Sequence, residues 1–174
     1  YPLRRQRQMC IRDRNSSVSC RNTLKKNMSK NLGQYKQELQ TRECLVQAIY
    51  QYIFNATSLN LLIEQFLAEN TPKKINVPYF KQRLKNIFEQ ADDLKEITRN
   101  LKDNEGENLE MIDEAVLWLG MVEIRANELP HPVVMDECIR LAKKFSNPNS
   151  FKFINAKLDE WLKTNKADWL KKSN

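Results

Sequence analysis

The sequence predicts an all-α protein, and three observations support that fold class. Glycine is scarce, with 3 residues among 174, whereas tight turns in sheet proteins depend on glycine. Apolar residues recur at three- and four-residue spacing in one segment after another, which is the period of an amphipathic helix. Short polar or proline-containing breaks separate these segments. We therefore expect a bundle of about seven helices with a single core.

The first predicted helix covers residues 41–55. Leu45, Ala48 and Ile49 fall on one stripe of this helix, so they are expected to face the core. Thr41 is the expected N-cap, because its hydroxyl can accept a hydrogen bond from one of the first free amides. Three side chains lie off the stripe, where a partner could reach them: Arg42, Gln47 and Tyr50.

Three further helices complete the first half of the predicted bundle. One covers residues 58–69, with Ser58 as its cap, and ends before a break at residues 71–74. The next begins near Pro78, a residue favoured in the first turn of a helix, and its neighbour continues to Leu101. A predicted turn at residues 104–107 separates the two halves of the chain.

The second half contains the most regular apolar stripe of the sequence. This stripe covers residues 109–124 and ends before the interruption at residues 130–132. A helix over residues 133–145 is expected to follow. After a break at residues 146–149, a last helix begins at Ser150.

The positive charge belongs to the N-terminal part of the chain. Residues 1–36 hold ten Lys and Arg residues against the single acid Asp13, whereas residues 37–174 carry a net charge of −2. A basic arm on a neutral domain is typical of proteins that bind nucleic acid. Residues 1–34 are expected to be a disordered leader, and residues 35–174 to form the folded domain. Residues 1–14 resemble a translated sequencing-adapter read-through, so we expect them to be non-native and Met28 to be the natural start.

Several classes of function find no support in the residue pattern. Four cysteines show no paired spacing, and the single histidine, His131, lies between two prolines, so neither a metal site nor a catalytic dyad is indicated. The three glycines are too scattered for a phosphate loop. No apolar run approaches the roughly 20 residues of a membrane span. We expect a cytoplasmic protein without catalytic residues, metal or cofactor.

Four motifs, met in order along the chain, resemble those of the NusB family. The first helix resembles R-E-x-A-x-Q-A-L-Y, with matches at Arg42, Glu43, Gln47, Ala48 and Tyr50. The middle segments resemble L-x-x-[ILV]-[DE]-x-A-V-L-R-[IL]-x-x-x-E-[IL] and V-P-x-x-V-A-I-N-E-A, with matches that include Leu109, Ile112, Asp113, Ala115, Glu123 and Glu137. The last helix resembles S-x-K-F-V-N-G-x-L-D, with matches at Ser150, Lys152, Phe153, Ile154, Asn155, Leu158 and Asp159. The resemblance covers about residues 38–165.

The resemblance implies a non-catalytic role in transcription antitermination. Members of this family are built as two packed three-helix subdomains. They pair with NusE, a small ribosomal protein, bind the single-stranded boxA element of ribosomal RNA transcripts, and join RNA polymerase so that it resists termination. The positions that match imply RNA contacts at Lys36, Arg42, Tyr50, Asn149, Lys152 and Phe153. They imply NusE contacts at Asp113 and at Glu110 close to it.

Departures from the family pattern leave two alternatives open. The arginine cluster usual before the first helix is reduced to Lys36 and Arg42, which predicts weaker RNA binding by this chain alone. One alternative is a helical interaction module that has lost RNA binding. The other is a NusB-like domain detached from a ribosomal-RNA cytosine methyltransferase. The sequence does not decide between a free monomer and a homodimer.

Overall fold

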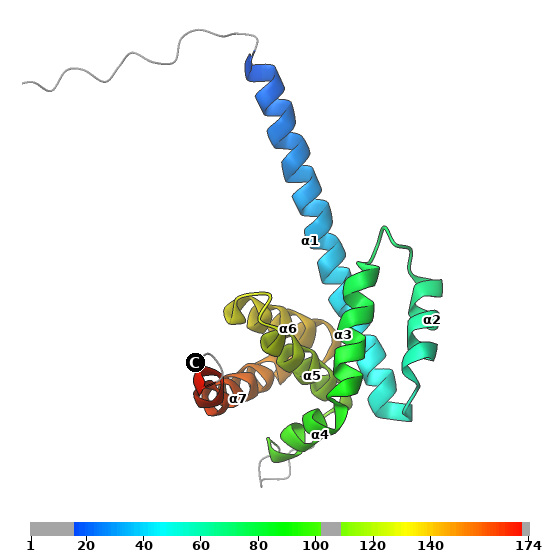
Figure 1. Cartoon of the computed structure of the whole chain (residues 1–174), viewed down its shortest axis with the longest axis vertical. Helices are drawn as coiled ribbons and strands as arrows, with labels where there is room; N and C mark the ends of the chain where they lie inside the picture. Colours follow the sequence, from blue (N-terminus) through cyan, green and yellow to red (C-terminus); the bar gives the residue numbers. More distant parts are fainter. Residues whose placement is uncertain (1–15, 102–108, 172–174) are drawn as a thin grey trace, which may run out of the picture. The chain divides into compact units, whose positions relative to one another are not determined.

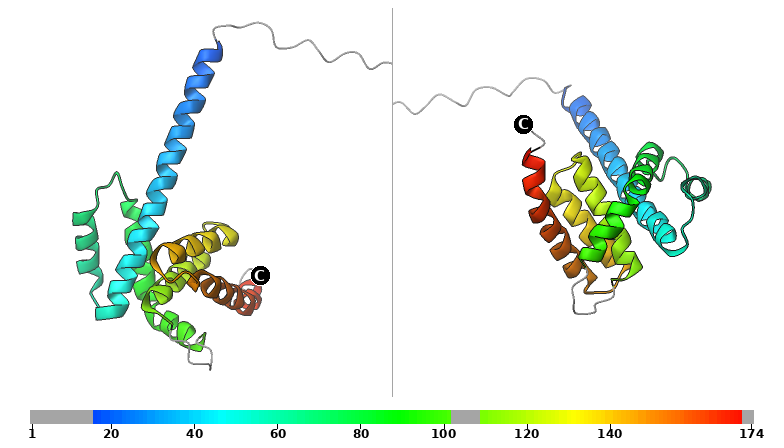
Figure 2. Two further views of the ribbon diagram at one scale, coloured as in Figure 1. Left: turned by 180° about the vertical axis from the view of Figure 1, so that it is seen from behind. Right: turned by 60° about the horizontal axis from the view of Figure 1, so that its bottom comes forward.

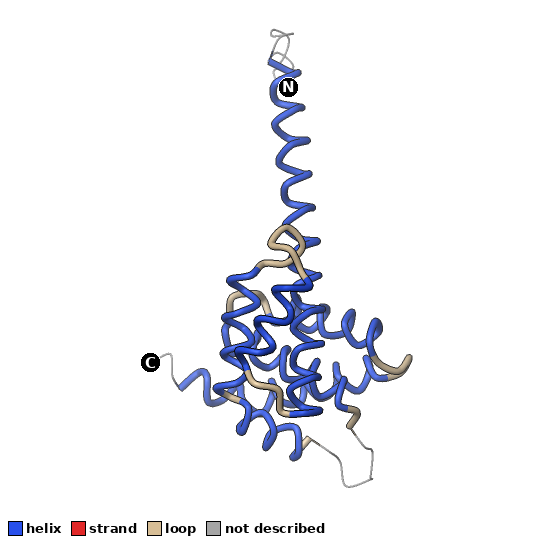
Figure 3. The backbone as a smooth tube through the Cα atoms, turned by 90° about the vertical axis from the view of Figure 1, so that its right-hand side faces the viewer, coloured by secondary structure: helices blue, strands red, loops and turns tan. Residues whose placement is uncertain are grey.

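The computed structural model describes residues 16–101 and 109–171, and all the regular secondary structure of these residues is α-helical (Figure 3). The helices are α1 (Ser16–Asn55), α2 (Leu59–Glu69), α3 (Val77–Glu89), α4 (Ala91–Asn100), α5 (Met111–Ala126), α6 (His131–Phe145) and α7 (Ser150–Lys171). The predicted all-α fold is therefore confirmed. The turn expected at residues 104–107 lies outside the described residues.

The chain divides into two compact units, Tyr1–Lys36 and Gln37–Asn174, and each is described here by itself. In the first unit, α1 begins at Ser16, so the disorder expected for residues 1–34 does not hold from Ser16 onward. The adapter-like segment, residues 1–14, lies outside the described residues. Between Ser16 and Lys36 the chain has no proline and only one glycine, so nothing local interrupts a helix there.

Thr41 is not a helix cap, and this corrects the expected helix start. Because α1 is already helical before this residue, the amides of the next turn are bonded and need no cap. The buried Thr41 hydroxyl instead donates a hydrogen bond to the Gln37 carbonyl at 2.7 Å. It also accepts one from the Asn76 backbone N–H at 2.8 Å, which ties α1 to the loop before α3.

The other helix ends follow their local sequence signals. Ser58 stands at the N-cap of α2, although its side chain makes no capping hydrogen bond. Asn76 caps α3 by accepting from the Tyr79 backbone N–H, and Pro78 lies in the first turn of that helix. Asn127 ends α5 in the left-handed conformation, with φ of 51°, which asparagine tolerates better than most residues.

Two groups of helices make up the second unit, as the family resemblance implied. Helices α5, α6 and α7 pack against one another in Figure 1, and α3 lies against α5. The second half of α1 runs beside α2 and α3 (Figure 2). The Tyr52 ring centroid on α1 lies 4.3 Å from that of Phe88 on α3. Helix α4 contacts both α3 and α5. The same core cluster runs through both groups.

Helix α5 lies at the centre of this unit. Its residues from Ala115 to Ile124 are all buried, so the stripe predicted from the sequence is in fact buried on every side. A helix surrounded by neighbours needs no polar face, and this explains the apolar character of the segment. Among the described helices, none combines the length and the apolar character that crossing a lipid bilayer requires.

Candidate nucleic-acid interface

Arg42 is buried, which corrects its prediction as an RNA-contacting residue on an open face of the first helix. The residue is 4% exposed, and its Nε lies 3.0 and 3.2 Å from the two carboxylate oxygens of Glu123 on α5. Burial alone would lower the pKa of the guanidinium, but Glu123, Tyr79 and Glu137 together outweigh burial and raise the pKa. Glu123 also accepts a hydrogen bond from the Tyr79 hydroxyl. Arg42 therefore connects α1, α3 and α5 within the protein.

The buried charges continue from Arg42 toward the surface of α6. Glu137 lies 4.0 Å from the Arg42 guanidinium and accepts a hydrogen bond from Arg140 at 3.1 Å. Glu43, the residue after Arg42 on α1, accepts hydrogen bonds from Arg140 at 2.8 Å and from Lys144 at 2.6 Å. Burial would raise the pKa of the Glu43 carboxyl, but these two hydrogen bonds outweigh burial and lower it. Glu43 is therefore charged at neutral pH and bound to two cations of α6.

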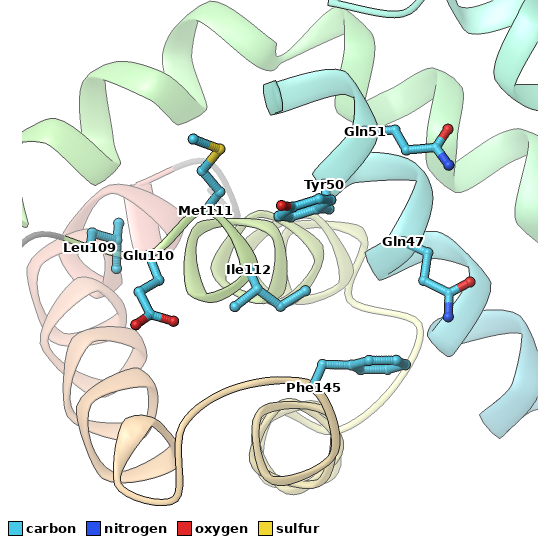
Figure 4. Close-up of a pocket in the computed structure, with 8 residues that line it drawn as sticks. All are labelled: Gln47, Tyr50, Gln51, Leu109, Glu110, Met111, Ile112 and Phe145. Atoms are coloured by element: carbon cyan, nitrogen blue, oxygen red, sulfur yellow. The ribbon is translucent and has the colours of Figure 1, made fainter. Parts of the chain in front are cut away.

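An open groove of about 740 Å³ lies between α1, α5 and α6. Three segments that are distant in the sequence form its walls: α1, the start of α5 and the end of α6. Its lining residues are Gln47, Tyr50, Gln51, Leu109, Glu110, Met111, Ile112 and Phe145. In Figure 4 the Tyr50 ring points from α1 toward Met111, and Phe145 lies across the opening from Ile112. The groove thus combines aromatic walls with amide side chains, which suits an unpaired nucleobase.

Tyr50 lies at the edge of this groove, as the sequence predicted from its place off the apolar stripe. It is 38% exposed, and its ring is nearly parallel to that of Phe54, with centroids 6.2 Å apart. Phe54 is 65% exposed and is the most exposed of the large apolar side chains among the described residues. Together the two rings form an aromatic surface along α1 that is partly open to solvent.

Cations lie over aromatic rings where α6 ends and α7 begins. Lys143 Nζ lies 4.6 Å from the centroid of the Phe151 ring, and Lys152 Nζ lies 5.9 Å from the same ring. Lys144 Nζ lies 5.5 Å from the ring of Phe145, which lines the groove. Alternating cations and aromatic rings can bind phosphates and bases of a single strand at the same time.

The remaining predicted RNA contacts lie in different surroundings. Lys152 and Asn149 are exposed, the latter in the turn between α6 and α7. Phe153 is only partly exposed and packs against the core, with Lys157 Nζ 5.7 Å from its ring centroid, so it is not an open stacking surface. Lys36 is exposed in the first unit of the chain.

The two predicted contacts for the protein partner differ in accessibility. Glu110 is exposed at the N-cap of α5, where it accepts a hydrogen bond from Asn147 at 2.6 Å and lines the groove. Asp113, expected on an accessible surface, is 5% exposed in the first turn of the same helix. Its Oδ1 is buried and has no hydrogen-bond partner among the residues that the structure describes. A carboxylate near a helix N-terminus is favoured by the helix dipole even without an ion pair.

The structure brings together some residues that sequence reasoning did not single out. Phe145 and Gln51 line the groove, Lys144 lies over the Phe145 ring, and Lys143 lies over the Phe151 ring of α7. One signal was present in the sequence, because Lys143-Lys144-Phe145 and Phe151-Lys152 interleave basic and aromatic residues. That Phe145 shares a groove with Tyr50 of α1 depends on the tertiary fold.

Comparison with known proteins identifies the relatives of this chain. The family model described as NusB family matches residues 39–163. The chain belongs to the NusB family. It is 39% identical over 124 residues to the transcription antitermination protein NusB of Psychromonas ingrahamii, covering 71% of this chain and 86% of that protein. It is 33% identical over 120 residues to the protein of the same name from Pectobacterium carotovorum, covering 68% and 86% of the two chains.

Family membership explains most of the ordered motifs, and the structure explains two departures from them. The family arginine after A-V-L is replaced by Trp118, which is fully buried and lies 6.2 Å from the Tyr52 ring. The family glycine after V-N is replaced by Ala156, which is exposed. An exposed alanine does not mark a close approach between helices. The close approach lies instead at Gly120.

Proposed function

We propose that this chain is a transcription antitermination factor that binds single-stranded boxA RNA of ribosomal RNA transcripts together with NusE. The observation that carries the proposal is the groove between α1, α5 and α6, which Tyr50 and Phe145 both line. An exposed aromatic ring beside amide side chains can stack on a base and read its edge. The complex would then join RNA polymerase and help it to resist termination, in the cytoplasm and without catalysis by this chain.

Exposed cations next to the groove support the RNA part of the proposal. Lys152 and Lys143 lie over one ring at the start of α7, and Asn149 adds no negative charge to the neighbouring turn. Phosphates of a strand whose bases enter the groove would meet these ammonium groups. Lys36, exposed in the first unit, is a separate proposed RNA contact.

The start of α5 is the proposed contact for NusE. Glu110 offers an exposed carboxylate, and the buried Asp113 lies in the first turn of the same helix. A basic ribosomal protein can supply donors to the Glu110 carboxylate, while Asp113 stays a predicted contact at this helix end. Glu110→Gln is expected to weaken NusE binding, which a pull-down or calorimetric titration would measure.

The proposal is tested by titrating labelled boxA RNA with this chain, in the presence and absence of NusE. Loss of one base-stacking ring costs about 1–3 kcal/mol, so Tyr50→Ala should weaken binding roughly 5- to 150-fold, whereas Tyr50→Phe should retain most of it. Leu61→Ala removes another exposed apolar side chain, on α2 and outside the groove, and serves as the control. Equal affinity for a scrambled RNA, or no binding even with NusE, would contradict the proposal.

A further inference from the structure

We infer that Arg140 and Lys144 of α6 contact RNA phosphates and take the place of the arginine cluster that this chain lacks before its first helix. This inference rests on the proposed RNA binding. It starts from the burial of Arg42, which is 4% exposed and already bound to Glu123. Since that guanidinium is not accessible, the cations that meet the phosphate backbone beside the groove must come from other helices.

The side chains of Arg140 and Lys144 lie where α6 contacts α1, next to the end of the groove that Gln47 lines. Glu43 binds both of them, and Gln47, one turn further along the same face of α1, lines the groove. Arg140 Nη2 also lies 3.4 Å from the Leu39 carbonyl, one turn before Glu43. The cations therefore continue the groove along α1, from the side of Tyr50 toward Leu39.

Both cations keep charge and donors available to a ligand. The side chain of Lys144 is 51% exposed. Within the described part of the chain it donates one hydrogen bond, to Glu43, although an ammonium group has three donors. The side chain of Arg140 is 30% exposed and still has N–H groups beyond those that bind Glu43, Glu137 and Leu39. A phosphate can approach either group from solvent without displacing Glu43.

Charge also accumulates along this part of α6. Arg140, Lys143 and Lys144, which we call the α6 basic edge, lie within five residues of one another, and Lys152 lies close to Lys143 over the Phe151 ring. The carboxylates that face these four cations are Glu43 and Glu137, and Glu137 is shared with Arg42. The edge therefore keeps an excess of positive charge, as a phosphate-binding surface requires.

Glu43 positions these cations. Its carboxylate binds Arg140 through one oxygen and Lys144 through the other, so the two long side chains are held toward α1 before RNA binds. Restricting flexible side chains in advance lowers the entropy cost of binding. Glu43 holds Arg140 and Lys144 across two helices, whereas Lys163, whose side chain is 74% exposed, pairs with Asp159 on its own helix.

The salt dependence of RNA binding tests the inference. For a single strand, the slope of log K against log salt changes by about 0.7 for each phosphate contact. Lys144→Gln should therefore weaken boxA binding several-fold at low salt and flatten the slope by about 0.7, and adding Arg140→Gln should flatten it further. Lys144→Arg should restore the slope. Lys163→Gln, the matched control on α7, should leave both affinity and slope at the wild-type values.

Two outcomes separate this inference from the function on which it rests. Wild-type protein that binds boxA RNA, together with a Lys144→Gln variant of unchanged slope, would overturn the α6 basic edge as a phosphate contact and leave the proposed function intact. Wild-type protein that binds no boxA RNA, with or without NusE, would overturn both. Thermal unfolding of each variant shows that it is folded. Since a merely structural loss would lower affinity equally at all salt concentrations, only a changed slope supports the inference.

Discussion

At the scale of single residues, the buried ion pairs determine which charged side chains are accessible to a binding partner. Arg42, Glu123, Glu137, Arg140 and Glu43 form a continuous series of ion pairs from the interior to the surface of α6. Buried ion pairs add little net stability relative to apolar residues, but the loss of one partner leaves an uncompensated charge. The interior members of this series are therefore structural, and only its outer end can bind a ligand.

Replacement of Arg42 tests this division. Arg42→Met should lower the free energy of unfolding by about 3–5 kcal/mol, because Glu123 would lose its buried counter-ion. Urea unfolding monitored by circular dichroism gives this value. The control is Lys85→Met, in an exposed pair with Glu89, which should change stability by less than about 0.5 kcal/mol. A stable Arg42→Met protein that fails to bind RNA would instead restore Arg42 as a direct contact.

At the scale of helices, α5 is positioned by the close approach of α6 and α7 at Gly120. A Cβ atom built on Gly120 would lie 2.7 Å from Cys138 Sγ and 3.3 Å from a Leu158 methyl carbon. No side chain fits there without movement of its neighbours. The groove depends on this packing, since the start of α5 and the end of α6 form two of its walls.

Gly120→Ala should therefore destabilise the protein by about 1–3 kcal/mol through overpacking, measured as a lower urea midpoint. Combination with Cys138→Ala, which removes the sulfur atom in the way, should recover part of the loss, so that the two changes are not additive. Gly33→Ala is the matched control, because no atom lies within 4 Å of a Cβ at Gly33. It should be neutral or slightly stabilising in α1. Additive effects of Gly120→Ala and Cys138→Ala would contradict the steric explanation.

At the scale of the whole molecule, the folded core belongs to the second unit. The buried apolar residues found among the described part of the chain all lie between Cys44 and Trp161. The ten Lys and Arg residues of positions 1–36 thus add charge to a domain whose own net charge is −2. Folding and basicity are carried by different parts of the chain.

A chain shortened to residues 37–174 should accordingly unfold cooperatively with a melting temperature within about 4 °C of that of the full chain, since 1 kcal/mol corresponds to a few degrees for a domain of this size. Differential scanning calorimetry of both proteins measures this. A broad transition or a much lower melting temperature in the shortened chain would show that residues before Gln37 contribute to the core.

The sequence by itself determined the helices, the core positions of the first helix and the family. Leu45, Ala48 and Ile49 are fully buried as their spacing predicted, because helical periodicity is a local property that any window of the chain displays. The helix ends at Asn55, Glu69 and Phe145 follow from breaks that are equally local. The start at Thr41 was predicted wrongly because a residue that favours caps was treated as a cap, although the helix begins earlier. Helix α6 begins at His131, two residues before its predicted start, since Pro132 is tolerated in a first helical turn.

Only the tertiary structure decided which residues of these helices are accessible. Arg42 and Tyr50 both lie off the apolar stripe of α1, yet Arg42 is covered by α5 and α6 while Tyr50 faces an open groove. The partners of Glu43 stand 97 and 101 residues away in the sequence. No local pattern encodes a pairing over such a separation, because it depends on how α6 is placed against α1. Contacts between helices that are distant in the sequence thus determine which side chains are accessible, whereas contacts within each helix determine the fold class.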